Sequence, residues 1–279
     1  MTTTLRPSEP LQQSADGARS RTYDICVNSR PVGSVRLATD PAFGPASGLI
    51  DGLRVDEPDR GRGRGTVAAL AAEEVLRSWG CVEVQISVPA EATAALRMAG
   101  SLGYTERSRN MLKELPDEPP ELPAGFAHRP ATEEEFAAWS ARSMARFAQS
   151  WVERGVPEEL ARAKAEDGRR RFLPQGLATP GVTVAVSTRD GEVTGYLWTG
   201  GMQPAAGPRQ SFVFEVEVEE GQRGRGYGRG LMLLAERVAL AAGERLLGLH
   251  VFTGNTPAVR LYESLGYRTT HVNSYKELR

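Results

Sequence analysis

With 279 residues and 40% hydrophobic content, the chain can form one large core or two modest ones, and two domains are the better expectation. Its formal net charge of −1, from 34 basic and 35 acidic residues, provides no overall field that would attract nucleic acid or an anionic membrane. Two cysteines and three dispersed histidines exclude a disulfide framework and argue against a metal site. Since the N-terminus is polar and no apolar run approaches the ~20 residues of a membrane span, we expect a cytoplasmic protein.

Glycine and arginine alternate in two stretches of the chain. The first, "RGRGRG" at residues 60–65, precedes an alanine-rich run, and the second, "QRGRGYGRG" at 222–230, precedes an apolar, helix-like run. Arg60 and Arg223 are 163 residues apart (223 − 60 = 163), and "SLGY" at 101–104 recurs at 264–267 with the same offset. The chain is therefore predicted to be a tandem duplication.

A proline-rich segment separates the two copies. Four prolines in "KELPDEPPELPAGF" exclude a helix or a central strand there and favour an extended, semi-rigid linker. We place the first domain at residues 1–114, the linker at 115–125 and the second domain at 126–279.

The second domain shows the clearer pattern of elements. After Thr132 as a cap, aromatic and small residues recur at spacings of three and four, which predicts an amphipathic helix with Trp139 and Phe147 on one face. A second helix should run through "EELARAKAEDGRRRF", followed by a hairpin that turns at Asp190 and Gly191. These helices do not by themselves indicate a ligand site, because aromatic residues at such spacings more often pack in the core than line a binding pocket.

A strand follows the hairpin and leads directly into the second glycine stretch. In "SFVFEVEVEE" the strand period places Phe212, Phe214, Val216 and Val218 on one face and Val213, Glu215 and Glu217 on the other. A helix through "LMLLAERVALAAG" should end at Gly243, a strand "RLLGLHVF" carries His250, and "NTPAVRLYESLGY" predicts a short helix. We expect His250 to be a core residue.

The glycine stretch between this strand and helix predicts a phosphate site. Free backbone N–H groups at a helix start, together with about half a positive charge from the helix dipole, bind anions. No Lys-Ser or Lys-Thr follows, as a nucleoside triphosphate loop would require, and Gly224, Gly226 and Gly228 lack the spacing of a dinucleotide fingerprint. A tight loop with solvated arginines remains the alternative.

The loop "RGRGYG" and the downstream "NTPAVRLYESLGY" resemble the GNAT superfamily of acyl-CoA-dependent N-acyltransferases. The resemblance implies an α/β (α+β) fold of two tandem domains, each a mixed, mostly antiparallel sheet flanked by helices, with two splayed strands that admit the pantetheine arm of acetyl-CoA. It implies that the backbone of Val216 and Val218 holds that arm, that Asn255 contacts it and that Tyr262 lies beside its sulfur. It assigns the pyrophosphate loop to Arg223, Gly224, Arg225, Gly226, Tyr227 and Gly228.

The chemistry of acetyl transfer suggests roles for three side chains. Tyr262, with an unperturbed pKa of ~10, stays protonated at neutral pH and can donate a hydrogen bond to the leaving thiolate. Glu217, and slightly less so Glu215, are the candidate bases, although a carboxylate near ~4.3 needs a raised pKa or a water relay to deprotonate an ammonium. A purely solvated face for both glutamates remains open.

The first copy lacks the counterparts of Asn255 and Tyr262. Ala92 and Ala99 stand at the positions of Asn255 and Tyr262 (255 − 163 = 92; 262 − 163 = 99), while the loop residues at 60, 63 and 65 persist. About 40 residues, corresponding to the helical pair that in this family walls the acceptor pocket, are also missing. We therefore expect the first copy to be a non-catalytic partner domain, an arrangement that resembles actinobacterial mycothiol synthases, although no motif identifies their substrate.

Two functions follow. The first is an acetyl-CoA-dependent N-acetyltransferase that acts on a primary amine, with a small molecule as the favoured acceptor, with no nucleic-acid or membrane partner and as a monomer or homodimer. The alternative is an acyl-CoA-binding sensor or interaction module without turnover.

Overall fold

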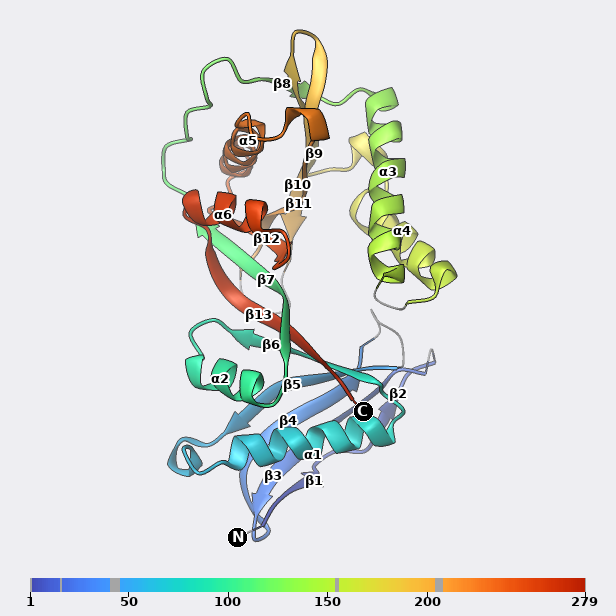
Figure 1. The fold of residues 1–279 in the computed structure, drawn as a ribbon, viewed down its shortest axis with the longest axis vertical. Helices are drawn as coiled ribbons and strands as arrows, with labels where there is room; N and C mark the ends of the chain where they lie inside the picture. The colour runs from blue at the N-terminus through green and yellow to red at the C-terminus, as the bar shows by residue number, and fades with distance from the viewer. Residues whose placement is uncertain (1, 16, 41–45, 154–155, 204–207, 279) are drawn as a thin grey trace. The chain divides into compact units, whose positions relative to one another are not determined.

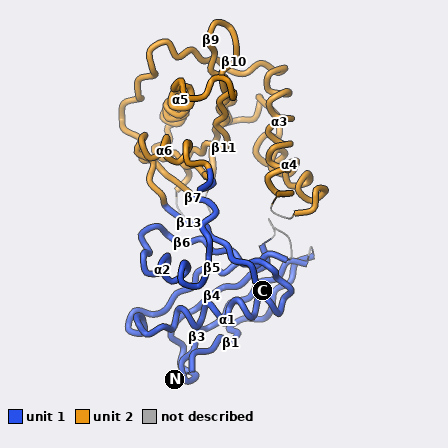
Figure 2. Tube along the Cα trace, viewed as in Figure 1, with its two compact units in different colours: residues 1–109, 252–254, 270–279 blue, residues 110–251, 255–269 orange. Residues whose placement is uncertain are grey.

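The computed structural model describes residues 2–15, 17–40, 46–153, 156–203 and 208–278. The chain forms two compact units (Figure 2). Unit 1 consists of Met1–Arg109, Phe252–Gly254 and Thr270–Arg279, and unit 2 consists of Asn110–Val251 and Asn255–Thr269. In the described part of the chain, no helix combines the length and the apolar character needed to cross a membrane.

Unit 1 is a sheet covered by two helices, α1 (Arg64–Ser78) and α2 (Thr93–Ser101). Its strands are β1 (Thr3–Pro7), β2 (Gln12–Gln13), β3 (Arg19–Val27), β4 (Arg30–Thr39), β5 (Ser47–Val55), β6 (Glu83–Pro89) and the greater part of β13 (Arg268–Glu277). The strand order is β1-β3-β4-β5-β6-β13, with β2 beside β3, and only the β5–β6 pair among these is parallel. The core contains Ala68, Ala72 and Leu76 of α1, which recur at spacings of four along one face.

Unit 2 repeats this plan with two additional helices (Figure 1). Its strands are the end of β7 (Thr105–Glu114), β8 (Ala127–Pro130), β9 (Val182–Arg189), β10 (Glu192–Met202), β11 (Gln210–Val218) and β12 (Leu246–Phe252), in the order β7-β12-β11-β10-β9-β8. Its helices are α3 (Glu133–Val152), α4 (Glu158–Phe172), α5 (Tyr227–Ala241) and α6 (Thr256–Ser264). The predicted fold class, a mixed sheet flanked by helices in each of two copies, is confirmed.

Local sequence signals account for several of these elements. Thr132 caps α3 as predicted: its side chain accepts from the Glu135 N–H at 3.2 Å, and the Glu135 carboxylate accepts from the Thr132 N–H at 2.9 Å. Asp190 and Gly191 both have positive φ, 51° and 86°, as a tight hairpin turn between β9 and β10 requires. The α5 helix begins at Tyr227, so the end of the glycine stretch is helical rather than part of the loop.

A bulge in β11 corrects the predicted alternation of its faces. The pairing with β10 runs from Trp198↔Glu215 to Thr199↔Val213, which leaves Phe214 without a partner in the register. Val213, Val216 and Val218 pack on the main core, while the Phe214 ring stacks on Trp198. The prediction that Phe214 shares a face with the two valines is therefore wrong, because one extra residue shifts the period of the strand.

Each unit takes its last strand from the other half of the chain. Residues 271–277 of β13 pair antiparallel with β6 inside unit 1, whereas the end of β7 lies beside β12 inside unit 2. Lys276 on β13 donates to the buried Glu73 at 2.7 Å, and Lys113 on β7 donates to Glu236, whose side chain is fully buried, at 2.7 and 2.8 Å. These two ion pairs occupy repeat-equivalent positions (236 − 73 = 163; 276 − 113 = 163).

Candidate active site

The ladder between the parallel strands β11 and β12 is short. It runs from Ser211↔Leu247 to Val213↔Leu249 and ends there, although β11 continues to Val218 and β12 to Phe252. The backbone edge of β11 from Glu215 to Val218 is therefore released from β12. A released strand edge presents N–H and C=O groups that another extended chain of amides can pair with.

The glycine loop lies directly after this edge. Gly224 and Gly226 adopt the left-handed conformation, with φ of +77° and +87°, and Gly226 is the N-cap of α5. Since Gly226 contributes no side-chain cap, the first N–H groups of α5 have no cap hydrogen bond from it. A methyl group at Gly228 would lie 3.3 Å from the Leu261 side chain, so this glycine allows α5 and α6 to approach closely.

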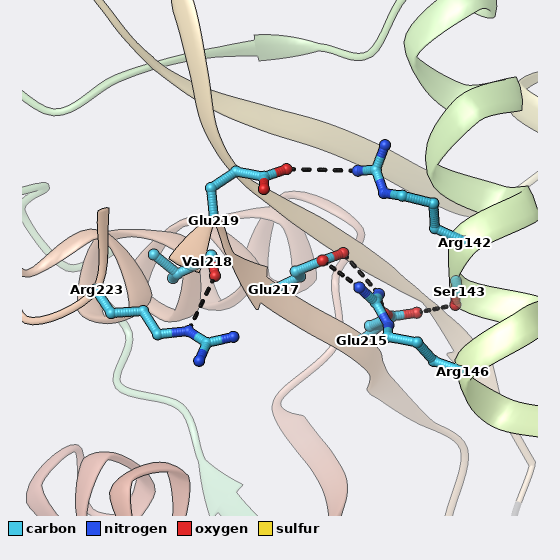
Figure 3. Close-up of polar contacts among 8 residues, drawn as sticks. All are labelled: Arg142, Ser143, Arg146, Glu215, Glu217, Val218, Glu219 and Arg223. Atoms are coloured by element: carbon cyan, nitrogen blue, oxygen red, sulfur yellow. Dashed lines mark hydrogen bonds and ion pairs between the residues drawn. The ribbon is translucent and has the colours of Figure 1, made fainter. Parts of the chain in front are cut away.

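Arg223 folds back over the end of β11. Its Nε donates to the Val218 carbonyl oxygen at 3.4 Å, and in Figure 3 its terminal nitrogens point away from the strand. This arginine therefore supports the turn from strand to loop with one part of its guanidinium and keeps the remainder exposed beside the loop.

Glu215 and Glu217 extend from β11 toward α3, where Arg146 binds both (Figure 3). The Arg146 Nη2 atom lies 2.8 Å from one oxygen of Glu215 and 2.7 Å from one oxygen of Glu217, and Nη1 contacts the second oxygen of Glu217. The Ser143 hydroxyl donates to the other oxygen of Glu215. We call Arg146 with these two glutamates the Arg146 clamp; Arg142 pairs separately with Glu219 at 3.4 Å.

The Arg146 clamp and burial shift the pKa of Glu215 in opposite directions. Burial raises the pKa of the Glu215 carboxyl above its ordinary value, while the hydrogen bond from Ser143 and the charge of Arg146 oppose that rise. A raised pKa brings a carboxyl closer to the range in which it can accept a proton from an amine.

Tyr262 on α6 is a core residue of unit 2. It packs in the core that contains Val216 and Val218, and its ring centroid is 6.0 Å from that of Tyr267. Burial raises the pKa of its hydroxyl to about 12, so the group is a proton donor throughout the neutral range.

Asn255 has a local structural task that the sequence analysis missed. Its side-chain oxygen accepts from the Ala258 N–H at 3.3 Å and so caps α6. The signal was present, since asparagine followed by Thr-Pro is typical of a helix start. The prediction of His250 as a core residue is wrong: Leu247, Leu249 and Val251 of β12 are buried, whereas His250 is exposed.

A pocket of about 220 Å³ lies beside the clamp, between α3, α4, β10 and β11. It is lined by the aromatic side chains of Trp139, Phe147, Phe172, Trp198 and Phe214 and by Ser143 and Glu215. The sequence analysis predicted the helix that carries Trp139 but did not bring Phe172, Trp198 and Phe214 together, because they belong to three separate elements.

A model described as the acetyltransferase (GNAT) family matches residues 3–104 and 132–267, which together are more than half of the chain. The chain belongs to the GNAT acetyltransferase family. Both sequence copies are matched, and the chain is an acyl-CoA-dependent transferase of the N-acetyltransferase type.

Relatives of two sizes are found. The uncharacterized N-acetyltransferase YycN of Bacillus subtilis is 29% identical over 152 residues, which cover 53% of this chain and 96% of the relative. A mycothiol acetyltransferase of Acidothermus cellulolyticus is 30% identical over 252 residues, which cover 83% of this chain and 70% of the relative. The first relative therefore corresponds in length to about one GNAT copy and the second to most of both.

Solved structures support the two-copy GNAT fold. A GCN5-related N-acetyltransferase from Sphaerobacter thermophilus superposes with a TM-score of 0.59 at 24% identity, covering 92% of this chain and 81% of the other. A tandem GNAT protein from the clavulanic acid biosynthesis pathway gives a TM-score of 0.53 at 19% identity, covering 94% and 84%. At these identities the likeness concerns the fold alone.

Proposed function

We propose that the protein transfers an acetyl group from acetyl-CoA directly to a primary amine of a small molecule, in the site of unit 2. The observation that carries this proposal is the early end of the β11–β12 ladder, which leaves an unpaired strand edge between the glycine loop and the helix that bears Tyr262. Unpaired backbone amides suit the pantetheine arm, and a loop without side chains at Gly224 and Gly226 suits a pyrophosphate.

The residues of the cofactor site divide the binding task. The backbone of Val216 and Val218 would pair with the amides of the pantetheine arm. The N–H groups around residues 224–228 would hold the pyrophosphate, with the exposed nitrogens of Arg223 and Arg225 adding charge. Asn255, through the part of its amide that does not cap α6, would contact the arm.

In the reaction, the amine nitrogen bonds to the acetyl carbon while the bond from that carbon to sulfur breaks, and the amine proton finally resides on the thiol. Tyr262, protonated because its pKa is about 12, donates a hydrogen bond that stabilises the departing thiolate. Since a thiol with a pKa of ~8.5 is the stronger acid, complete proton transfer from the tyrosine is not required.

Glu215 is the better placed of the two candidate bases. It lines the pocket in which an amine would lie, and burial raises its pKa. Glu217 is bound through both of its oxygens by Arg146, so it acts more readily as the anchor of the clamp than as a proton acceptor. A water molecule between the amine and Glu215 would complete the route of the proton.

Release of free thiol from acetyl-CoA, measured over a panel of primary amines, tests the proposal. We expect turnover with at least one amine, and loss of about 100-fold in kcat in Tyr262→Phe with little change in acetyl-CoA affinity. Absence of turnover on every amine, with acetyl-CoA still bound, would contradict the proposed reaction.

Acyl-CoA binding without chemistry is the second candidate, and it concerns unit 1. A cavity of about 420 Å³ lies there between β5, β6 and α2, and Ala92 and Ala99 are among its lining residues. Ala99→Phe would fill part of that cavity. If the intact protein binds two equivalents of acetyl-CoA in calorimetry and this variant binds one, the binding role is supported.

A further inference from the structure

The pocket beside the Arg146 clamp has a preorganised aromatic wall. The rings of Trp198 and Phe214 are stacked, with centroids 4.7 Å apart and planes inclined by 24°. Phe172 packs on Phe214 at 4.8 Å, and Trp139 meets Trp198 edge to face at 6.0 Å. Because the rings fix one another, this aromatic wall needs little further ordering when a ligand binds.

Two buried hydrogen-bond donors belong to this wall. The indole Nε1 atoms of Trp139 and Trp198 are buried and have no hydrogen-bond partner among the described residues. Trp139 itself is 1% exposed. Neighbouring protein atoms cover both nitrogens, so these two indoles contribute to the rigid packing of the wall rather than providing a donor that a ligand can reach.

The charges of the lining are separated between two elements. Glu215 on β11 provides a carboxylate, held by Ser143 and the Arg146 clamp, whereas Arg169 in the last turn of α4 provides a guanidinium. A cationic amine is attracted by the carboxylate and by the faces of the aromatic rings. An oxygen on the same molecule can accept from Arg169.

The volume restricts the size of the ligand. Pockets for drug-sized molecules measure about 300–1,000 Å³, so a pocket of about 220 Å³ suits a compact molecule of one ring. Its largely aromatic lining disfavours a molecule covered with hydroxyl groups, which would leave many of them without partners.

We propose that this pocket selects, as the acetyl acceptor, a compact primary amine carried on a single aromatic ring that bears an oxygen substituent. The ring packs against the aromatic lining, the amino group lies at Glu215, and the oxygen accepts from the Arg169 guanidinium. The inference rests on the proposed acetyl transfer for its chemistry, and on the pocket alone for its choice of ligand.

The test uses four amines: tyramine, 2-phenylethylamine, 2-cyclohexylethylamine and glucosamine. Binding of each is followed without acetyl-CoA by calorimetry and by quenching of tryptophan fluorescence, and turnover is followed separately by thiol release. We expect tyramine to bind best, about fivefold more tightly than 2-phenylethylamine for one added hydrogen bond and about tenfold or more above the cyclohexyl amine. Glucosamine should bind least.

Two variants test whether side chains that line the pocket cause the preference for tyramine. Phe214→Leu should weaken tyramine binding about tenfold. Arg169→Met, which keeps a long side chain and removes its donors, should reduce the preference for tyramine over 2-phenylethylamine. Trp151→Phe, also on α3 but outside the pocket lining, is the control and should leave binding within twofold. Thermal unfolding of each variant confirms that it is folded.

The outcomes separate this inference from the proposed function. Tyramine binding that depends on Phe214, without turnover of any amine, supports the pocket and contradicts acetyl transfer. Turnover of glucosamine or the cyclohexyl amine at least as fast as that of tyramine, and insensitive to Phe214→Leu, supports acetyl transfer and overturns the assignment of the pocket. Equal binding of all four amines also overturns it.

Discussion

In unit 1 the glycine loop turns at Gly61 and Gly63 with φ of +71° and +72°, and in unit 2 it turns at Gly224 and Gly226 with +77° and +87°. The arginine before each loop behaves alike: Arg60 donates to the Val55 carbonyl at 2.8 Å, as Arg223 does to Val218. The ladder of β5 with β6 also ends early, at Ile50↔Ile86. The backbone geometry that we propose for the cofactor site is therefore present twice.

The side chains around the two loops differ in kind. In unit 1 the buried Asp59 pairs with Arg64 and, at 2.9 Å, with Arg30. The repeat-equivalent residues of Asp59 and Arg64 in unit 2 are Gln222 and Tyr227, so this ion cluster has no counterpart there. Ala92 and Ala99 replace Asn255 and Tyr262, and no helical pair like α3 and α4 precedes β3 in the described part of unit 1. The comparison indicates that the loop keeps its backbone conformation although the side chains beside it differ.

The exchanged strands provide the largest expected effect. Lys113→Met would leave the fully buried Glu236 without its cation and should reduce the stability of unit 2 by about 3–5 kcal/mol. Lys276→Met should do the same to unit 1 through Glu73. Hydrogen exchange, read separately for peptides of the two units, locates each loss.

A double variant tests whether the loss of stability comes from the unpaired charge of Glu236. Glu236→Gln combined with Lys113→Met removes both partners and should recover part of the stability, because no unpaired charge remains buried. If Lys113→Met instead increased exchange mainly in unit 1, the assignment of the end of β7 to unit 2 would be incorrect.

The proposed restriction of catalysis to unit 2 predicts the next largest effect. Tyr262→Phe should lower kcat about 100-fold, which corresponds to about 2.7 kcal/mol, because the leaving thiolate loses its hydrogen-bond donor. The matched change in unit 1, Ala99→Ser at the repeat-equivalent position, should leave kcat within twofold. Steady-state thiol release measures both, and a larger effect of the Ala99 variant would move the chemistry to unit 1.

The Arg146 clamp predicts how the reaction depends on pH. Glu215 must be deprotonated to accept a proton, and burial raises its pKa, so kcat/KM should fall on acidification at a higher pH than for an exposed glutamate. Besides Arg146, Ser143 and Glu217 act on this carboxyl. Arg146→Gln removes the charge that opposes the rise and should move the acidic limb upward by about one unit.

Arg142→Gln is the control for this shift, because Arg142 is on the same helix and pairs with Glu219 rather than with Glu215. An acidic limb that moves equally in both variants would point to a general effect of lost positive charge. A limb that moves in neither would exclude Glu215 as the group that titrates.

Sequence periodicity was sufficient to predict the helices and strands, but it was insufficient to predict how the side chains of the candidate site come together. The offset of 163 predicted two copies, which the family match to both segments confirms, and the capped helix at Thr132 and the turn at Asp190 were local signals that were confirmed. The faces of β11 were mispredicted, since a bulge at Phe214 adds one residue to a period of two and nothing in the alternation marks it.

Long-range pairing was beyond the sequence for a different reason. The last strands of the two copies have similar patterns, so β7 and β13 could each pair within its own copy or exchange, and local propensity is the same in both cases. The Arg146 clamp was likewise hidden, because it depends on which face of α3 turns toward β11. The lysines at 113 and 276 gave no signal until their buried glutamates were known.

The smallest expected effect concerns the loop arginines. Arg223 uses only Nε at 3.4 Å to hold the end of β11, which leaves its terminal nitrogens for a phosphate, so Arg223→Ala should weaken acetyl-CoA binding about fivefold to tenfold. Arg60→Ala should change neither the affinity nor the number of sites if the cofactor binds in unit 2 alone. Calorimetric titration decides between the units: two sites in the parent, with one lost in Arg60→Ala, would make unit 1 a cofactor domain. The two copies would then differ in chemistry but not in binding, because the same loop geometry would be used twice.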